Sequence, residues 1–405
     1  MLEGKSILVG VTGGIAAYKT AELVRYLVKA GAGVRVIMTA AAQQFITPLT
    51  LQTLSGQPVG TDLFGLESES RIGHIHMART AQLVVVAPAT ANIMAKMAAG
   101  IADDYLSTTI LATTAPVLIC PAMNAVMWEH PATRRNLGTL RELGYHVHEP
   151  EAGPLACKEE GAGRLAELPA IVESCRRLLT PPTLRGKRVL VSAGPTWEFL
   201  DPVRFISNPS TGKMGYALAA AAARRAAEVH LVSGPARICA PPGVDLQKVT
   251  TAIEMKEAIS RMADGMDAII MAAAVSDYRA PEASPQKVKK IEEQSHIALA
   301  RNPDILAALG KARKTARYVL VGFAAETEHL IENATEKLVR KNLDLIVAND
   351  LTETGSGFGG DTNHVKILDR EGGVTELPLM SKEAVAEKIL DRVELLLDER
   401  TSEGA

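Results

Sequence analysis

The stretch from Arg188 to Gly215, RVLVSAGPTWEFLDPVRFISNPSTGKMG, carries the strongest fold signal in the chain. Its first five residues form an apolar run typical of a buried strand, and an alanine-rich helix is expected to begin near Lys213. A strand that leads through a long polar loop into a helix presents backbone N–H groups to an anion. The loop is not a P-loop, because Ser207 stands at the first glycine position and Met214 follows the lysine. The stretch therefore predicts a strand–loop–helix unit with a ligand site in mid-chain.

Length and composition narrow the class of protein. The chain has 405 residues, enough for two or three domains. Its net charge is −2 and its aromatic content is 4%, which give no support for binding to nucleic acid or to a membrane surface. No signal peptide or apolar run of about 18 residues is recognisable, and the four cysteines form no CxxC pair. We therefore expect a cytoplasmic protein that contacts neither nucleic acid nor membrane.

Apolar runs alternate with helical patterns throughout, which is typical of parallel sheets covered on both faces. In the first half we expect strands at 6–11, 34–39, 82–87, 117–120 and 145–149, with helices at 16–30, 92–99, 103–113 and 168–179. In the second half we expect strands at 188–192, 228–233, 267–273, 318–324 and 343–348, a hairpin of 364–369 with 374–379, and helices at 213–227, 253–263, 303–309, 328–341 and 382–397.

The proline pair after residue 180 predicts a stiff linker between two domains, 1–180 and 181–405. Both domains are predicted to be doubly wound, Rossmann-like α/β folds. Ligands in such folds bind beyond the carboxyl ends of the strands. The polar motifs of this chain fall at those ends.

The first strand–helix turn, Thr12-Gly13-Gly14, lacks the spacing of a dinucleotide-binding fingerprint. The second strand ends at Thr39, where an acidic residue would be expected for NAD. A Thr-Gly-Gly turn with a hydroxyl at the next strand end suits a phosphate monoester such as that of FMN. A glycine-rich turn of this kind is also common as a plain tight connection, so the turn alone leaves both interpretations open.

Three residues of the first half have side chains suited to proton transfer. His74 is expected at the start of a short helix, Asn124 follows a strand, and Cys157 lies in a glycine-flanked loop that could close as a lid. Together they suit proton transfer beside a redox cofactor. Taken singly, His74 is also explained as a surface or helix-capping residue and Cys157 as an incidental loop thiol.

The second half carries polar residues of a different kind. Small residues at 272–274 would let a nucleotide approach the backbone, and Asp277 just beyond them can hold Mg2+. Lys287 lies in a proline-containing loop that could close over a triphosphate, while Lys337 and Lys341 share one helical face. On charge alone, such lysines are also explained as a solvated face.

These motifs together resemble known families over nearly the whole chain. Thr12 to Lys19 (TGGIAAYK), His74, residues 87–92 (APATAN), residues 121–124 (PAMN) and Cys157 resemble the homo-oligomeric flavin-containing cysteine decarboxylases. The SAGPT, DPVRFISN and TGKMG segments of the second half resemble phosphopantothenate–cysteine ligase. Their fusion in this order resembles the bifunctional phosphopantothenoylcysteine decarboxylase/phosphopantothenate–cysteine ligases of coenzyme A biosynthesis.

For the first half, the resemblance implies FMN-dependent decarboxylation of phosphopantothenoylcysteine, through a thioaldehyde that loses CO2, to 4′-phosphopantetheine. It implies that His74 is the essential histidine, that Met123 binds substrate, that Asn124 binds the substrate carboxylate, and that Cys157 donates a proton to the enethiolate. The residues that it implies for FMN binding are Gly13, Gly14, Ile15, Thr39, Ala89, Thr90, Ser107 and Thr108.

For the second half, the resemblance implies that CTP and 4′-phosphopantothenate form an acyl-cytidylate, from which cysteine displaces CMP. Asn208 would hold the acyl-cytidylate by donating hydrogen bonds to phosphate oxygen, Arg204 would bind substrate, Lys287 would assist the first step and Asp277 would bind Mg2+. The residues implied for CTP binding are Met271, Ala272, Ala273, Asp277, Lys287, Pro303, Asp304, Ile305, Phe323, Lys337 and Lys341.

The resemblance also implies a homo-oligomer with trimeric N-terminal and dimeric C-terminal contacts, which together allow a dodecamer. The chain departs from the family pattern at Lys158, Leu165 and Ala226, and Ala226 stands where a glycine commonly ends the helix. Three alternatives remain: a regulatory relative whose second half only binds, a flavin prenyltransferase-like enzyme, and a non-enzymatic scaffold. The presence of Asn208 and Lys287 disfavours the first of these.

Overall fold

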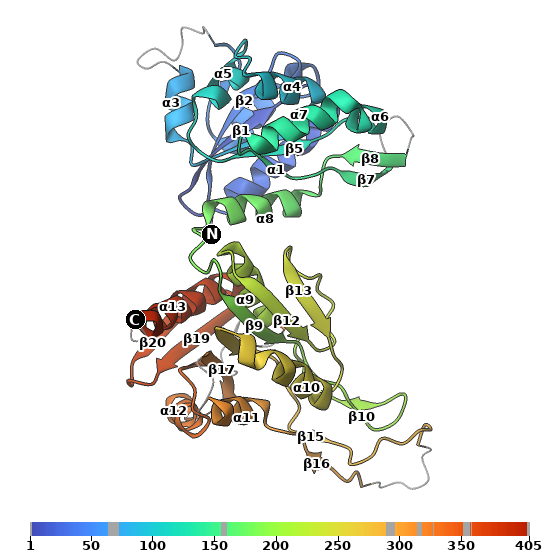
Figure 1. The fold of residues 1–405 in the computed structure, drawn as a ribbon, viewed down its shortest axis with the longest axis vertical. Coiled ribbons are helices and arrows are strands. Elements are labelled where there is room, and N and C mark those ends of the chain that lie inside the picture. The colour runs from blue at the N-terminus through green and yellow to red at the C-terminus, as the bar shows by residue number, and fades with distance from the viewer. Residues whose placement is uncertain are drawn as a thin grey trace. The chain divides into compact units, whose positions relative to one another are not determined.

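The computed structural model describes residues 2–63, 73–154, 160–288, 296–313, 318–326, 328–350, 357 and 359–402. Cys157 and Lys158, which the sequence singles out, lie outside this set. The chain separates into two compact units, Met1–Thr180 and Pro181–Ala405. Each unit is described by itself below (Figure 1).

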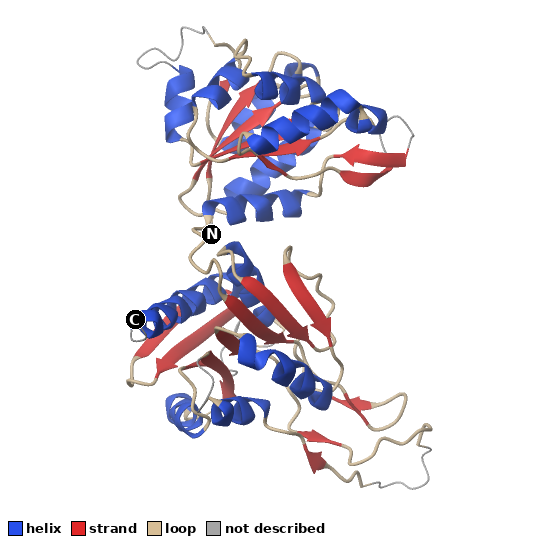
Figure 2. Ribbon diagram, in the orientation of Figure 1, coloured by secondary structure: helices blue, strands red, loops and turns tan. Residues whose placement is uncertain are grey.

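The first unit is built on a six-stranded parallel sheet of order β3-β2-β1-β4-β5-β6 (Figure 2). Its strands are β1 (Ser6–Val11), β2 (Gly33–Met38), β3 (Val59–Gly60), β4 (Leu83–Ala89), β5 (Val117–Pro121) and β6 (His146–Val147), with a separate antiparallel hairpin of β7 (Glu151–Pro154) and β8 (Glu160–Arg164). Its helices are α1 (Ala17–Lys29), η1 (Ala42–Gln44), α2 (Pro48–Ser55), α3 (Gly73–Thr80), α4 (Ala91–Ala99), α5 (Tyr105–Ala112), α6 (Ala125–Glu129), α7 (Pro131–Glu142) and α8 (Leu168–Leu179).

The second unit has an eight-stranded sheet of order β13-β12-β9-β14-β17-β18-β19-β20, parallel up to β18 and antiparallel beyond it. These strands are β9 (Arg188–Ala193), β12 (Glu228–Ser233), β13 (Val244–Lys248), β14 (Ala268–Met271), β17 (Val319–Glu326), β18 (Leu345–Asp350), β19 (Thr362–Asp369) and β20 (Val374–Ser381). The short pairs are β10 (Glu198–Phe199) with β11 (Phe205–Ile206) and β15 (Tyr278–Arg279) with β16 (Ala300–Arg301). The helices are α9 (Lys213–Arg224), α10 (Ala252–Met262), η3 (Ala263–Gly265), α11 (Ile305–Ala312), α12 (Leu330–Arg340) and α13 (Lys382–Ser402).

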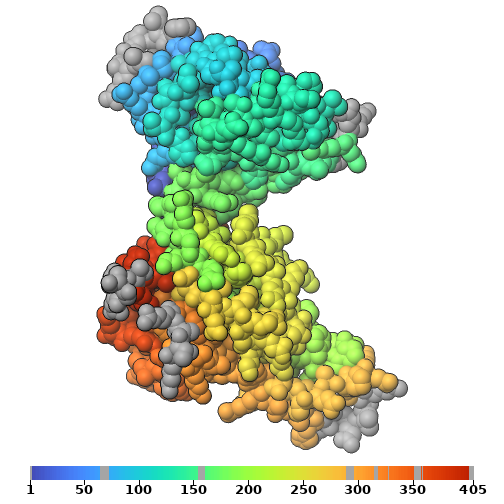
Figure 3. Space-filling model, viewed as in Figure 1, coloured from blue at the N-terminus to red at the C-terminus, as the bar shows by residue number. Residues whose placement is uncertain are grey.

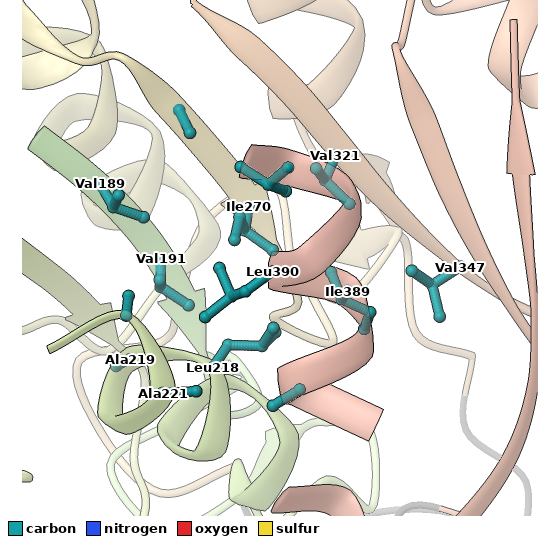
Figure 4. Close-up of a cluster of buried hydrophobic side chains, with 14 of the residues drawn as sticks. Val189, Val191, Leu218, Ala219, Ala221, Ile270, Val321, Val347, Ile389 and Leu390 are labelled. Atoms are coloured by element: carbon teal, nitrogen blue, oxygen red, sulfur yellow. The ribbon is translucent and has the colours of Figure 1, made fainter. Parts of the chain in front are cut away.

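Buried aliphatic side chains explain why helices cover both faces of the second sheet. Helices α9 and α13 pack on one face, and α10, α11 and α12 pack on the other. Figure 4 shows the first of these layers, in which Leu390 lies by Val191 and Ile270 of the central strands and Ile389 lies toward Val347. Each such side chain contributes roughly 1.5–3 kcal/mol when it leaves water, so this layer fixes the start of α9 against the sheet.

The first unit is layered in the same way. Helices α1, α2 and α8 pack on one face of its sheet, and α4, α5, α6 and α7 on the other. The predicted fold class, two doubly wound Rossmann-like domains, is confirmed. Across the described ranges, no helix is both long and apolar enough to span a membrane.

Most expected elements are present with shifts of one to three residues. The helix expected at 213–227 ends at Arg224, because Ala226 adopts a left-handed conformation with φ 65°. Helix α7 was not predicted, since its polar face dominates its sequence and only Thr133, Leu137 and Leu140 are buried. The stretch around residues 151–164, expected as a loop, is partly the β7–β8 hairpin, whose glycines mask a strand signal.

In both sheets the strand order reverses at the centre, between β1 and β4 in the first and between β9 and β14 in the second. Helices on the two sides of such a point diverge and leave a crevice beyond the carboxyl ends of the strands. Both crevices described next lie there.

Candidate active sites

The crevice of the first unit encloses about 650 Å³, within the range of small-molecule sites. It is lined by the turn after β1, the start of α4, the segment after β5, and β8. The lining residues are Gly13, Gly14, Ile15, Ala16, Tyr18, Lys19, Thr90, Ala91, Ala122, Met123, Asn124, Met127, Gly163, Arg164 and Leu165. The predicted residues Gly13, Gly14, Ile15, Thr90, Met123 and Asn124 are thus brought together.

Buried hydroxyl groups fix the glycine turn to the neighbouring strand. Thr12 Oγ1 donates a hydrogen bond to the Pro88 carbonyl oxygen at 2.7 Å and accepts one from the Thr90 N–H at 3.1 Å. Gly13 is required for packing, because a Cβ there would lie 2.4 Å from the Ala41 Cβ. The turn is therefore held rigidly against the start of α4, as a site for a bound anion requires.

Asn124 is the N-cap of α6, and its Oδ1 accepts a hydrogen bond from the Val126 N–H at 2.8 Å. The β8 strand is seated beside it, since the Met123 N–H donates to the Gly163 carbonyl oxygen at 2.9 Å. A Cβ at Gly163 would lie 2.3 Å from the Met123 carbonyl oxygen, so only glycine allows this approach. The β7–β8 hairpin thus covers the segment that carries Asn124.

Several predicted first-site residues do not line this crevice. His74 lies on α3, which packs against α5, the helix that carries Ser107 and Thr108. The Thr39 hydroxyl accepts a hydrogen bond from the Ala42 N–H at the start of η1. Ala89 is fully buried, and Cys157 lies outside the described residues. Only some of the residues predicted for the first site therefore line this crevice within one chain.

Some lining residues had no predicted role. Lys19 and Arg164 bring positive charge to the crevice, while Tyr18 and Met127, together with the predicted Ile15, offer exposed apolar surface. Lys19 lies in the first turn of α1, directly after the glycine turn. A lysine at the start of a helix that follows such a turn is a sequence signal for a phosphate site. Cations, a glycine turn and apolar side chains together fit a planar aromatic cofactor with a terminal phosphate, such as FMN.

The crevice of the second unit encloses about 510 Å³. Of the residues predicted to bind CTP, all except Lys287 line it, namely Met271, Ala272, Ala273, Asp277, Pro303, Asp304, Ile305, Phe323, Lys337 and Lys341. Asn208 lines it too, whereas Arg204 does not. The predicted nucleotide site is thus gathered within one chain.

Asn208 is held by the strand end opposite its loop. Its Nδ2 donates to the carbonyl oxygens of Ala274 and Val275, both at 3.2 Å. Nδ2 was expected to donate to phosphate, but it already donates to these two backbone carbonyl oxygens. The Asn208 atom that remains for a ligand is therefore Oδ1. Asn208 is presented as an acceptor rather than a donor.

One end of the crevice, at α11, carries charges that are paired one to one. Asp304 caps α11 by accepting from the Ala307 N–H at 2.9 Å and pairs with Lys341 at 2.8 Å. Burial opposes ionisation of Asp304, but Lys341 and the cap outweigh it and hold its pKa below the usual value. Lys337 pairs with Glu326 of β17 in the same way.

Asp277 is exposed at the rim, and its carbonyl oxygen accepts from the Asn302 N–H at 2.8 Å. Within the described part of the chain, no cluster of three or more metal-ligating side chains is found. A single carboxylate suits Mg2+ that is shared with a triphosphate, because Mg2+ keeps phosphate and water ligands. Asp277 therefore fits Mg2+ that is brought with a nucleotide.

Arg204 and Lys287 belong to an arm outside the crevice. Asp201 pairs with Arg204 and accepts from the Val288 N–H at 3.2 Å, while Arg204 Nη2 donates to the Val288 carbonyl oxygen at 2.6 Å. The Arg204 guanidinium, opposed by burial, holds the pKa of Asp201 well below its ordinary value. Figure 3 shows the light-green surface near residue 200 lying against the orange segment that carries exposed Lys287.

Comparisons with known proteins define the class first. Residues 1–180 match the family described as Flavoprotein, and residues 184–396 match the DNA/pantothenate metabolism flavoprotein C-terminal domain. The chain is therefore a flavoprotein-family domain fused to a pantothenate-metabolism domain.

The chain is 48% identical to the coenzyme A biosynthesis bifunctional protein CoaBC of Vibrio cholerae, over 96% of this chain and 98% of that protein. It is also 48% identical to the Bacillus subtilis protein of the same name, over 98% of each. The crystal structure of a CoaBC C-terminal domain is 42% identical, covering 54% of this chain and 99% of that one, with a TM-score of 0.46.

The chain belongs to the family of bifunctional coenzyme A biosynthesis proteins. It is a bifunctional enzyme that joins a phosphopantothenoylcysteine decarboxylase and a phosphopantothenate–cysteine ligase. The two crevices correspond in number to these two reactions.

Proposed function

We propose that the first unit decarboxylates phosphopantothenoylcysteine with FMN and that the second joins 4′-phosphopantothenate to cysteine with CTP and Mg2+. The convergence of the predicted CTP residues on one crevice is the observation that carries the assignment of the second unit. The glycine turn, with Lys19 and Arg164 on the rim of the other crevice, supports the assignment of the first.

In the first unit, bound FMN would supply reversible oxidation of the substrate cysteinyl group. The Gly13-Gly14 turn and Lys19 would hold the cofactor phosphate, because backbone N–H groups and an ammonium favour an anion. Asn124 would orient the substrate carboxylate for loss as CO2. Cys157 would return a proton to carbon, since a thiol with an ordinary pKa near ~8.5 is a competent acid at neutral pH.

In the second unit, the carboxylate of 4′-phosphopantothenate attacks the α-phosphate of CTP and pyrophosphate leaves. Lys287 would stabilise the charge that develops on the phosphate as its arm closes. The cysteine amine then attacks the acyl carbon, and CMP leaves. Asn208 Oδ1 would accept a hydrogen bond from that amine and direct its lone pair at the acyl group. Asn208 would therefore act mainly in the second step and Lys287 in the first.

The first site is completed by a second copy of the chain in this proposal. His74, Ser107 and Thr108 lie on α3 and α5, away from the crevice. Ile15 and Tyr18 are each 59% exposed on its rim, an apolar surface suited to a subunit contact. We propose a cytoplasmic homo-oligomer in which α3 and α5 of one copy face the crevice of the next, with trimeric N-terminal and dimeric C-terminal contacts.

Purified full-length protein tests the proposal directly. It should show flavin absorbance and, with 4′-phosphopantothenate, cysteine, CTP and Mg2+, should release pyrophosphate, CMP and CO2 in equal amounts. The Cys157→Ser variant should release CO2 but accumulate the unprotonated product, because a hydroxyl is a far weaker acid than a thiol. Colourless protein that retains no added FMN would refute the first assignment, and ligation without any nucleotide would refute the second.

A further inference from the structure

Asp201 lies in the arm that carries Arg204, and the mechanism above gives it no role. It comes shortly after β10, a strand that packs against β15 (Figure 1). Its side chain is 0% exposed. An ionised carboxylate is buried to this extent only where hydrogen bonds and an opposite charge replace water. The partners of Asp201 therefore show what this residue holds in place.

The two carboxylate oxygens of Asp201 serve different parts of the chain. Oδ1 accepts hydrogen bonds from the N–H groups of Val203 at 2.8 Å and Arg204 at 2.9 Å, and so closes the turn of residues 200–204. Oδ2 accepts from Arg204 Nε at 2.9 Å and from the N–H of Val288 at 3.2 Å, which lies 87 positions later in the chain. One oxygen thus shapes the turn, and the other joins the turn to the segment of residues 284–288.

Two further hydrogen bonds cross between the same turn and segment. Arg204 Nη2 donates to the Val288 carbonyl oxygen at 2.6 Å. The Ser284 N–H donates to the Leu200 carbonyl oxygen at 2.9 Å. Lys287 stands between these two attachment points and is itself exposed. The backbone on both sides of Lys287 is therefore held by the turn, while its side chain stays accessible.

The link between turn and segment depends on the charge of Asp201. The Arg204 guanidinium, opposed by burial, lowers the pKa of Asp201, and the N–H groups of Val203, Arg204 and Val288 lower it further. Because the pKa is lowered, the carboxylate stays ionised above about pH 4, and the link persists over the usual assay range. An amide in its place would offer one oxygen and no charge.

We propose that Asp201 is a positioning residue for the first ligation step, which fixes the backbone on both sides of Lys287 so that the lysine meets the α-phosphate of CTP from a fixed base. A lysine on an unattached loop would lose backbone and side-chain freedom each time it met the phosphate, and an anchored backbone removes part of that cost. Asp201 touches neither nucleotide nor substrate and acts through Lys287. The proposal therefore rests on the role assigned to Lys287 above.

Asp201→Asn separates the tasks of the two oxygens. The amide keeps one oxygen for the turn, but it places an NH2 group where Oδ2 accepts from Arg204 and Val288. Pyrophosphate release should slow about 10–100-fold, because a misplaced group costs this much. The rate is measured without cysteine, at saturating CTP and 4′-phosphopantothenate. The Kd of CTP from isothermal titration should stay within about twofold, since Asp201 does not line the crevice. An unchanged rate, or a large loss of CTP affinity, would contradict the proposal.

A double variant shows whether Asp201 acts through the lysine. Lys287→Gln alone should slow pyrophosphate release, and adding Asp201→Asn should slow it by no more than about twofold further, because an absent lysine cannot be misplaced. Multiplied losses would overturn the proposal and leave the role of Lys287 intact. A wild-type rate for Lys287→Gln alone would overturn the assignment of Lys287 and this proposal with it.

Val288→Pro breaks the link from the other side. It removes the N–H that donates to Asp201 Oδ2 and leaves Asp201 and Arg204 unchanged. Its pyrophosphate release should slow about as much as that of Asp201→Asn. Val288→Ala is the matched control, since the Val288 side chain is 52% exposed and the variant keeps the N–H. Equal rates for Val288→Pro and Val288→Ala would contradict the proposal.

Trypsin gives a readout that needs no activity, because it cuts after Lys287, at a bond whose next residue is held by the link. Asp201→Asn should speed cleavage at Lys287 about tenfold, the expected effect of one lost charge-assisted contact. Glu198→Gln is the matched control, because Glu198 is 3% exposed on the same arm but accepts from the Ala252 N–H. It should change neither cleavage nor pyrophosphate release. Equal cleavage of wild type and Asp201→Asn would show that Asp201 does not hold this segment.

Discussion

The two crevices differ in how much of each predicted site lies within one chain. In the second unit, nearly every residue predicted for CTP lines a single crevice. In the first, the glycine turn, Thr90 and Asn124 come together, but His74, Ser107 and Thr108 lie on α3 and α5 away from it. Since both units have the same central strand order, the fold alone does not explain the difference. We infer that one chain holds most of the second site, its nucleotide-binding part, and that the first site is shared between copies.

The largest expected effects are on the two reaction rates, because each site should lose its own reaction without affecting the other. Asn124→Ala should lower decarboxylation by about 10²–10³-fold and leave ligation within about twofold. Asn208→Ala should do the reverse, and it should still release pyrophosphate from CTP, because the first step does not use its Oδ1. Each variant is the control for the other when CO2, CMP and pyrophosphate are measured separately. Equal loss of both reactions in either variant would contradict two separate sites.

The α11 end of the second crevice predicts an intermediate effect. Lys341→Met removes a cation that lines the crevice, and it should raise the KM for CTP about tenfold, the expected cost of one charge-assisted contact. Arg340→Met is the matched control, since Arg340 pairs with Glu336 on the exposed face of the same helix. Initial rates at varied CTP decide the matter. Similar KM values for both variants would remove α12 from the nucleotide site.

The end of α9 predicts the smallest effect, which concerns stability. Ala226 has φ 65°, a conformation that glycine adopts without strain. Ala226→Gly should therefore stabilise the second unit by about 0.5–1 kcal/mol, whereas Ala223→Gly inside α9 should destabilise it by a similar amount. Thermal unfolding followed by calorimetry measures both. A lower Tm for Ala226→Gly would show that another contact compensates for the strain.

The sequence predicted the parts of each site that lie close together in the chain, and it did not predict the parts that only the fold brings together. Strand ends with small and polar residues, such as 271–277, predicted the second crevice because parallel strands end at one edge of a sheet. Lys382 at the start of α13 and Asn363 of β19 also line the second crevice and were missed, since they reach it only through the order of β17 to β20. The position of His74 relative to Asn124 was equally beyond prediction, because it depends on the packing of α3 on α5.

The most direct test of a shared first site is complementation between inactive chains. His74→Gln and Asn124→Ala chains should each be inactive alone as a decarboxylase. When they are co-expressed and assemble at random into rings, about a quarter of the contacts pair an intact crevice with an intact α3 of the next copy. The mixed oligomers should therefore regain about a quarter of wild-type decarboxylase activity. Co-expressed Asn208→Ala and Lys341→Met chains should show ligation no higher than the average of the separate variants. Recovery of decarboxylation without recovery of ligation is the result we predict. Absence of decarboxylase recovery in verified mixed oligomers would contradict the account.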